Sequence, residues 1–226
     1  MDNLVIVESQ AKAKKIQSFL EKSFPSKTWK VHACLGHVRD LKDDESAVDP
    51  SNWPKLKWEL TQKGRKTLKD IRDFVKGSSE IYLASDPDRE GEAIAWHILD
   101  HLQEKKLVEG RQINRISFNE ITPSAIKNAI ENPRDIDQFL VDAYLARRVL
   151  DHLIGFKVSP LLWRHVPRAK SAGRVQSPTL RMICSREDEI DAFCPEEFWP
   201  IKVDFKTKDC AFTSDLIMKN EKDLKK

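Results

Sequence analysis

Acidic side chains crowd one short stretch of the sequence, Asp86 to Glu92 (DPDREGE), which places four carboxylates within seven residues. The stretch follows an apolar segment, EIYLAS, that is typical of a buried strand. Mutual repulsion makes such a cluster costly unless a cation or shared protons compensate for it. Capping of a following helix is the simpler explanation for any one acid, because the helix dipole favours negative charge in the first turn. Capping explains less well why Asp86 and Asp88 stand together after a strand.

Another acid, Glu8, also follows a short apolar run, LVIV. The carboxyl ends of neighbouring parallel strands meet at one edge of a sheet, where open α/β sheets bind their ligands. If the two strands are neighbours, four carboxylates converge there: Glu8, Asp86, Asp88 and Glu90. Oxygen ligands without His or Cys at metal spacing suit Mg²⁺, so these four residues are the predicted metal ligands.

Lys12 stands in the first turn of an expected helix that Ser9 can cap. A positive charge there opposes the helix dipole at a cost of about 0.3–1 kcal/mol. A nearby anion would offset this cost, and beside Mg²⁺ the natural anion is a phosphate. An ordinary surface lysine is the alternative. A strand followed by DxD also opens the haloacid-dehalogenase phosphatases, but these have Thr or Val where this sequence has Glu90.

Strand-like and helix-like segments alternate over about the first 130 residues. This order is typical of a parallel α/β sheet with helices on both faces. The expected strands are 4–7, 29–35, 80–85 and 113–118, and the expected helices are 11–20, 67–75, 90–103 and 122–131. Residues 37–63 are expected to form a long, irregular surface insertion.

A mainly helical segment is expected to follow. Its first helix should cover 135–153 and end at Gly155, and a second should cover 177–191. The expected inward stripe of the first helix is Phe139, Ala143, Ala146, Leu150 and Leu153. Segments 198–205 and 212–218 alternate like strands. We therefore expect three domains: an α/β domain over 1–134, a helical segment over 135–195, and the cut start of a β-containing domain over 196–226.

Basic residues concentrate between Leu145 and Met182, a window that contains eight of them and a single acid, Asp151. This window carries +7 within a chain of net charge +3, so the remainder carries −4. Such an asymmetric basic segment favours a polyanionic partner.

The four cysteines have neither CxxC spacing nor a histidine pair at zinc-finger distance. We expect Cys34, Cys184, Cys194 and Cys210 to be free, buried or half-buried thiols in a reducing compartment. The sequence shows no signal peptide and no long apolar run, which predicts a cytoplasmic protein without a membrane segment.

At this point a series of motifs resembles the type IA DNA topoisomerases, which contain a Toprim domain. The motifs are VESQAKAKKI (7–16), LGHVRDL (35–41), DPDREGEAIAWHI (86–98), RISFNEIT (115–122), ARRVLDHLIGFKVSPLLW (146–163), SAGRVQSPTLR (171–181) and CPEEFW (194–199). They cover nearly the whole chain in the family's order. The departures are Gln10 in place of a usual Pro, Tyr144 and Leu145 in place of glutamines, and His152 in place of an arginine.

The resemblance assigns roles to the acidic stretch. It implies that Glu8, Asp86, Asp88 and Glu90 bind Mg²⁺. It also implies that Glu8 is the general acid for the leaving 3′-oxygen and that Lys12 balances charge on the scissile phosphate. Glu8 and Lys12 are therefore the predicted catalytic residues.

The resemblance also implies that single-stranded DNA binds along the basic segment. The predicted DNA-binding residues are His37, Arg147, Arg148, Asp151, Phe156, Trp163, Ser171, Ala172, Gly173, Arg174, Val175 and Gln176. Arg147 and Arg148 can also reach Asp151 at helical spacing, so a solvated ion-pair face is the alternative to phosphate contact. Phe156 and Trp163 either stack on bases or pack into a core.

The resemblance implies a monomeric, Mg²⁺-dependent and ATP-independent enzyme that relaxes negatively supercoiled DNA by transient cleavage of one strand. The family's nucleophile is a tyrosine in a later motif rich in Arg and Thr, and neither Tyr82 nor Tyr144 stands in such a motif. We therefore expect this chain to bind single-stranded DNA without cutting it. Two alternatives stay open: an autonomous Toprim nuclease that uses metal-activated water, and a non-catalytic DNA-binding fragment whose acids merely cap a helix.

Overall fold

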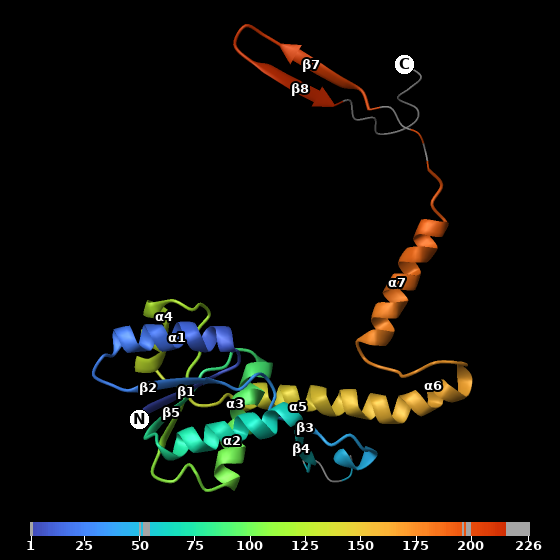
Figure 1. The fold of residues 1–226 in the computed structure, drawn as a ribbon. Helices are drawn as coiled ribbons and strands as arrows, with labels where there is room; N and C mark the ends of the chain where they lie inside the picture. Colours follow the sequence, from blue (N-terminus) through green and yellow to red (C-terminus); the bar gives the residue numbers. More distant parts are fainter. Residues whose placement is uncertain (1, 50, 52–54, 196, 198–199, 216–226) are drawn as a thin grey trace. The chain divides into compact units, whose positions relative to one another are not determined.

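The computed structural model describes residues 2–49, 51, 55–195, 197 and 200–215. The chain divides into two compact units, Met1–Gln176 and Ser177–Lys226. The first unit contains an α/β sheet followed by a run of helices (Figure 1). The domain boundaries expected at 134 and 195 are not tested by this division and stay predictions.

A parallel sheet of four strands forms the centre of the first unit, as expected from the alternation of segments. In spatial order the strands are β2 (Trp29–Ala33), β1 (Asn3–Val7), β5 (Glu80–Leu83) and β6 (Gln112–Arg115). Ile6 near the end of β1 is in register with Leu83 at the end of β5. The two strands that precede the predicted acidic site are therefore neighbours with their carboxyl ends side by side.

Helices cover both faces of this sheet (Figure 1). They are α1 (Gln10–Ser23) and α4 (Pro123–Glu131) on one face, and α2 (Gln62–Lys76) and α3 (Arg89–Glu104) on the other. Successive residues of β1 serve the two cores in turn, because side chains alternate across a strand. Val5 and Val7 pack under α1 and α4, whereas Leu4 and Ile6 pack under α2 and α3.

The stretch 37–63 is more regular than the sequence predicted. Its described residues include two short antiparallel strands and one helical turn: β3 (Arg39–Leu41), β4 (Trp58–Leu60) and η1 (Glu45–Ala47). Leu41 and Trp58 of this small sheet pack against Val149. Helix α2 also begins earlier than expected, because the Thr61 hydroxyl caps it by accepting a hydrogen bond from Gly64 N at 2.9 Å.

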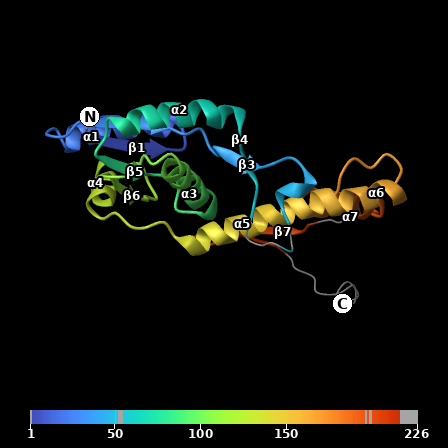
Figure 2. The ribbon, with the colours of Figure 1, turned by 90° about the horizontal axis from the view of Figure 1, so that it is seen from below.

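Helix α5 (Gln138–Leu153) turns a different face inward from the one predicted. Phe139 is 87% exposed, whereas the buried residues are Val141, Tyr144 and Val149. The helix packs beside α3 and the small β3–β4 sheet, and these neighbours select the buried face (Figure 2). The predicted stripe was wrong for Phe139, Ala143, Ala146 and Leu150, which are exposed, whereas Leu153 is half-buried against the cluster that contains Val149.

Gly155 does not end this helix, which is a second correction. The chain continues through the π-helical segment η3 (Ile154–Val158) into α6 (Ser159–His165). A glycine inside a helix costs only about 1 kcal/mol relative to alanine, so it terminates a helix reliably only where it takes a left-handed conformation. Gly36 and Gly110 do so among the described glycines, but Gly155 does not.

The second unit contains most of α7 (Gln176–Asp191) and a hairpin. The helix expected over 177–191 is thereby confirmed. The hairpin pairs β7 (Lys202–Lys206) with β8 (Ala211–Asp215) in antiparallel register. Residues 196, 198–199 and 216–218 of the predicted strands and the CPEEFW motif lie outside the described residues.

All four cysteines are free, as expected, but only Cys34 is buried. The expectation of burial is wrong for Cys184, Cys194 and Cys210, which are exposed. Burial raises the pKa of the Cys34 thiol to about 11. Within the described part of the chain, no helix has both the length and the apolar composition needed to cross a membrane.

Candidate active site and nucleic-acid interface

The acidic turn, residues 86–92, links the end of β5 to the start of α3. Asp88 caps α3, since its Oδ1 accepts a hydrogen bond from Gly91 N at 2.7 Å. Gly91 lies so close to the preceding turn that a Cβ atom there would stand 2.2 Å from the carbonyl oxygen of Asp86. The capping explanation therefore holds for Asp88, and glycine at position 91 allows the helix to start directly against Asp86.

Glu8, Lys12 and Asp86 lie together at the carboxyl ends of β1 and β5. The Lys12 Nζ atom is 2.5 Å from Asp86 Oδ1 and 3.6 Å from Glu8 Oε2. Asp86 N donates to Glu8 Oε1 at 2.8 Å, so the two acids are also joined directly. Partial burial lowers the pKa of Lys12, but its bonds to Asp86 and Glu8 outweigh this effect and raise the pKa overall. Lys12 is therefore a stable cation between two carboxylates.

Glu90, which was predicted as a metal ligand and lies in the first turn of α3, is bound by an arginine and a histidine. Its Oε1 atom is 3.0 Å from Arg147 Nη1 of α5, and its Oε2 atom is 3.2 Å from His37 Nε2. The four predicted ligands are thus brought to one edge of the sheet but engaged in three ways: with Lys12, as a helix cap, and with Arg147 and His37.

Metal-binding geometry is not assembled among these acids. In the part of the chain that the structure describes, no group of three or more His, Cys, Asp or Glu side chains is close enough to hold a metal ion. The donor chemistry nevertheless fits a hard cation such as Mg²⁺, because every donor is a carboxylate oxygen. Lys12 already places one positive charge between Glu8 and Asp86. A bound cation would take over this charge compensation.

An arginine pocket lies between the acidic turn and α5. It is a cavity of about 230 Å³ lined by His37, Asp40, Glu90, Tyr144, Arg147, Arg148 and Asp151. Arg148 is held by Asp40 of β3, with Nε and Nη2 at 2.8 and 2.6 Å from Oδ1, and not by Asp151 as its spacing suggested. A phosphate group suits such a pocket, because it can replace a carboxylate as the partner of an arginine.

Asp151, which lines this pocket, also binds a third arginine, Arg174. Its Oδ1 atom is 2.8 Å from Arg174 Nε, and its Oδ2 atom is 3.8 Å from Arg147 Nε. Arg174 belongs to the loop of Ser171, Ala172, Gly173, Arg174, Val175 and Gln176. Ala172 N donates to Ser159 Oγ of α6 at 3.0 Å, which fixes the loop against the helices. The loop and the ARR motif are therefore brought together through Asp151.

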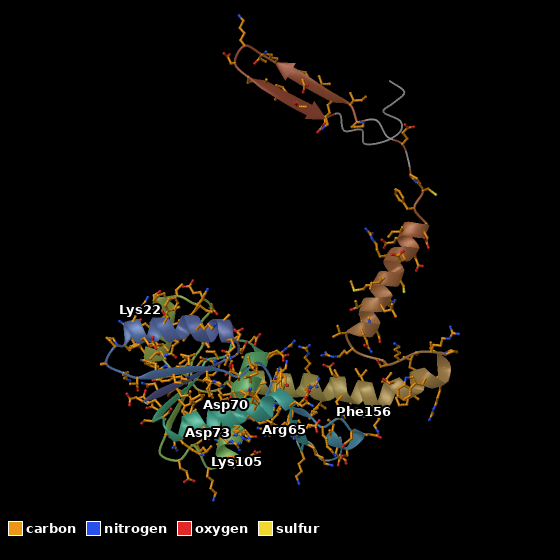
Figure 3. All side chains as sticks on the ribbon, in the orientation of Figure 1. Lys22, Arg65, Asp70, Asp73, Lys105 and Phe156 are labelled. Atoms are coloured by element: carbon orange, nitrogen blue, oxygen red, sulfur yellow. The ribbon has the colours of Figure 1, made fainter. Side chains whose placement is uncertain are left out.

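Phe156 and Trp163 stand apart from the acidic turn. Phe156 lies beyond α5, away from the sheet (Figure 3), and stacks on His152 with ring centroids 4.5 Å apart. Trp163 is 56% exposed and donates from Nε1 to Lys170 O at 2.7 Å. Neither ring belongs to the buried cores.

A second hollow, of about 430 Å³, lies on the Lys12 side of the acidic turn. It is lined by Lys12, Asp86, Pro87, Phe118, Asn119, Glu120 and Ile121. The acidic turn is therefore flanked by open space on two sides, one lined by Lys12 and one by Arg147.

A buried ion cluster beneath the turn was missed from the sequence. Glu92 is fully buried and bound by Arg115 at 2.9 Å and by Arg134 at 2.8 Å. Burial alone raises the pKa of Glu92, but hydrogen bonds from Arg134 and Arg115 outweigh it and lower the pKa to about 2. The available signal was Arg115 itself, a charged residue within the apolar strand INRISF, which requires a buried partner.

Comparison with protein families identifies two domains in the chain. The family described as Toprim domain matches residues 3–121, and the family described as DNA topoisomerase matches residues 135–226. The chain is 53% identical over 199 residues to DNA topoisomerase 1 of Xylella fastidiosa (strain Temecula1 / ATCC 700964), covering 88% of this chain and 24% of that protein. It is 46% identical over 225 residues to DNA topoisomerase 1 of Rickettsia typhi, covering 99% and 28%.

A solved structure shows the same architecture. Full-length topoisomerase I from Thermotoga maritima matches with a TM-score of 0.70 and 38% identity, over 98% of this chain and 36% of that one. The chain thus spans roughly a quarter to a third of the length of these proteins.

Proposed function

Because the chain belongs to the type IA DNA topoisomerase family, of which it carries the Toprim domain, we propose that it forms the metal- and phosphate-binding part of such an enzyme. The family is enzymatic and acts on DNA. The complete reaction that we propose is Mg²⁺-dependent, ATP-independent relaxation of negatively supercoiled DNA through transient cleavage of one strand. The observation that carries the proposal is the Lys12 ammonium between Glu8 and Asp86 at the ends of adjacent parallel strands.

The catalytic roles that we propose rest on the family resemblance, and this arrangement supports them. Toprim domains are associated with divalent metal binding, and we assign Mg²⁺ to Glu8, Asp86, Asp88 and Glu90. The metal would supply charge neutralisation on the phosphate. Lys12 stabilises negative charge at the scissile phosphate, and Glu8 delivers a proton to the leaving 3′-oxygen. Glu8 is 22% exposed and is joined to Asp86 N, which holds its carboxyl group at the open edge of the sheet.

The arginine pocket binds the DNA backbone in this proposal. Arg147, Arg148 and Arg174 each hold a carboxylate whose place a phosphate can take. Single-stranded DNA suits the site because Phe156 and Trp163 expose ring surface on the same run of helices, where unpaired bases can stack. The other residues of the loop 171–176 contact the bound DNA strand on either side of Arg174 in this proposal.

The chain's own tyrosines do not supply the nucleophile in this proposal. Tyr82 and Tyr144 are each 4% exposed. The Tyr82 hydroxyl donates to Glu80 Oε2 at 2.7 Å within the sheet, and burial raises the pKa of both phenols. We therefore propose that this chain binds single-stranded DNA but forms no covalent phosphotyrosine. Its monomeric state and cytoplasmic location stay predictions.

The test uses an end-labelled single-stranded oligonucleotide with Mg²⁺, resolved on a denaturing gel with and without protease treatment. Binding of the same oligonucleotide is measured by fluorescence anisotropy for the wild type, Lys12→Ala and Arg147→Ala. The proposal expects binding that Arg147→Ala weakens, and no cleaved product.

Each other outcome selects a different function. Cleavage with free ends, abolished by Asp86→Asn, would establish the autonomous nuclease that uses metal-activated water. A product that enters the gel only after protease treatment would show a covalent adduct and refute the role given to the tyrosines. Binding that is indifferent to Mg²⁺ and to Lys12→Ala would leave the non-catalytic DNA-binding fragment.

A further inference from the structure

Arg115 is a buried cation at the carboxyl end of β6, and its side chain is 1% exposed. It reaches across to β5 and holds the backbone on both sides of the point where the acidic turn begins. Nη1 donates to the carbonyl oxygens of Leu83 and Ser85 at 3.0 and 2.8 Å, and Nη2 donates to that of Asp86 at 2.9 Å. The direction in which Asp86 leaves the sheet is therefore fixed by one guanidinium group.

Glu92 compensates the charge of Arg115 and extends the network. Its Oε2 atom accepts from Arg115 Nε at 3.1 Å and Nη2 at 2.9 Å. The same carboxylate binds Arg134 through both oxygens, at 2.8 and 2.9 Å. Its Oε1 atom also accepts from Asp137 N at 2.8 Å, and Asp137 is the residue that caps α5. One carboxylate thus joins the acidic turn to the start of the helix that carries Arg147.

A role in stability alone does not account well for this cluster. Burying an ion pair costs desolvation that its attraction barely offsets, and apolar replacements are often neutral or stabilising. The cluster instead fixes geometry. It holds three carbonyl groups around the start of the acidic turn, those of Leu83, Ser85 and Asp86, and the amide of the residue that caps α5. Groups behind metal ligands orient those ligands, and their loss typically lowers metal affinity about 10- to 100-fold.

We propose that Arg115 and Glu92 are positioning residues that aim Asp86 at the metal and set Arg147 opposite it, without touching metal or phosphate themselves. This inference rests on the proposed function of the acidic site. It separates Glu92 from the other acids of the DPDREGE stretch, which project toward Lys12, the helix end and Arg147.

The test compares Arg115→Lys with Arg111→Lys in the full 226-residue chain. Lysine keeps the positive charge but loses the planar fork that binds several carbonyls at once. Arg111 is a matched control, because it also donates to main-chain carbonyls, at Val75 O (2.9 Å) and Ser78 O (3.2 Å), but before β5 and not after it. Mn²⁺ binding is followed by the electron paramagnetic resonance signal of the free ion, and stability by urea unfolding.

The expected result is a loss of stability in both variants but a 10- to 100-fold loss of Mn²⁺ affinity only in Arg115→Lys. Equal Mn²⁺ affinity in the folded Arg115→Lys variant and the wild type would overturn the inference. If Arg115→Lys does not fold, Arg134→Lys decides, because the Arg134 side chain is 35% exposed and loosens Glu92 from outside. Unchanged Mn²⁺ affinity in that variant would overturn the inference equally.

Failure of the proposed function gives a different pattern. In that case the wild type binds no Mn²⁺, or binds it equally well after Asp86→Asn, and the inference falls with it. Mn²⁺ binding that Asp86→Asn abolishes and Arg115→Lys leaves intact would preserve the proposed site while removing the positioning role.

Discussion

The carboxylate of Glu90 contacts two side chains, an arginine and a histidine, that the proposed function assigns to DNA. Arg147 and His37 lie 3.0 and 3.2 Å from its two oxygens. In the absence of metal, Glu90 therefore competes with phosphate for both groups. A metal ion that engages Glu90 would release them, so metal and DNA binding should favour each other.

Substitution of Glu90 tests this competition. In EDTA, Glu90→Gln is expected to raise single-stranded DNA affinity about 1.5- to 5-fold, which corresponds to an exposed ion pair of about 0.2–1 kcal/mol. The measurement is fluorescence anisotropy. Asp73→Asn is the control, because it removes the same charge from α2, where Asp73 is paired with Lys76 at 3.6 Å (Figure 3). Equal gains in both variants would attribute the effect to net charge and not to Glu90.

Glu92 links stability to acid pH. Its pKa is about 2 in the folded chain against an ordinary value of 4.5, so the unfolded chain takes up a proton first as the pH falls. Stability from Glu92 is therefore present above about pH 4.5 and is lost progressively between pH 4.5 and 2. Urea unfolding between pH 3 and 7 should show that the free energy of unfolding of Glu92→Gln is lower at pH 7 than that of the wild type. It should also fall less steeply as the pH is lowered. The same change at exposed Glu21 should leave the slope unchanged.

At the residue scale, the sequence could identify which residues carry the chemistry, but not which role each acid has in the structure. Carboxylates after two buried strands pointed to one edge, and the structure brings Glu8, Asp86 and Lys12 together there. Spacing could not show that Asp88 caps α3 while Glu92 turns inward, because an acid is favoured both at the cap position and in the first turn. The partner of Arg148 was also out of reach, since Asp40 is 108 positions away.

The junction of β5 and α3 depends on one glycine. A Cβ at Gly91 would stand 2.2 Å from a backbone oxygen of the acidic turn, and a backbone cannot rotate away as a side chain can. Gly91→Ala is expected to destabilise the chain by about 1–3 kcal/mol or more. Gly155→Ala is the matched control, because nothing lies within 4 Å of its Cβ position. It should change stability by less than about 1 kcal/mol. Similar unfolding midpoints for both variants would contradict the packing argument.

At the element scale, hydrophobic periodicity predicted the strands of the central sheet. It failed to predict the buried face of α5, which packs against more than one element. The strands β1 and β5 are short apolar runs, and this pattern is typical of strands that are buried on both faces of a parallel sheet. Helix α5 packs against both α3 and the small β3–β4 sheet, and neither partner can be identified from the sequence of the helix itself. The small sheet itself was missed because strands of three residues leave too short a pattern.

Across the whole molecule, the uneven charge predicts how DNA binding responds to salt. Each phosphate contact with single-stranded DNA contributes about 0.7 to the slope of log affinity against log salt. Arg147→Ala should lower this slope by about 0.7, and Arg65→Ala, on the exposed side of α2, should leave it unchanged (Figure 3). Anisotropy titrations between 50 and 200 mM salt, a span of roughly four-fold, suffice to distinguish them. An equal drop in both slopes would indicate diffuse attraction in place of a defined contact.

The single buried thiol has a practical consequence. Cys34 lies under α2 and α3, whereas the other three cysteines are exposed, so a thiol reagent should modify three groups quickly and one slowly. The rate of the slow phase reports how often the structure around Cys34 opens, because this thiol reacts only in molecules that have transiently unfolded around it. A ligand that binds only the closed form slows that phase by the factor 1 + L/Kd, where L is the free ligand concentration. The chain thus contains its own reporter for metal and DNA, and it requires no dye and no turnover.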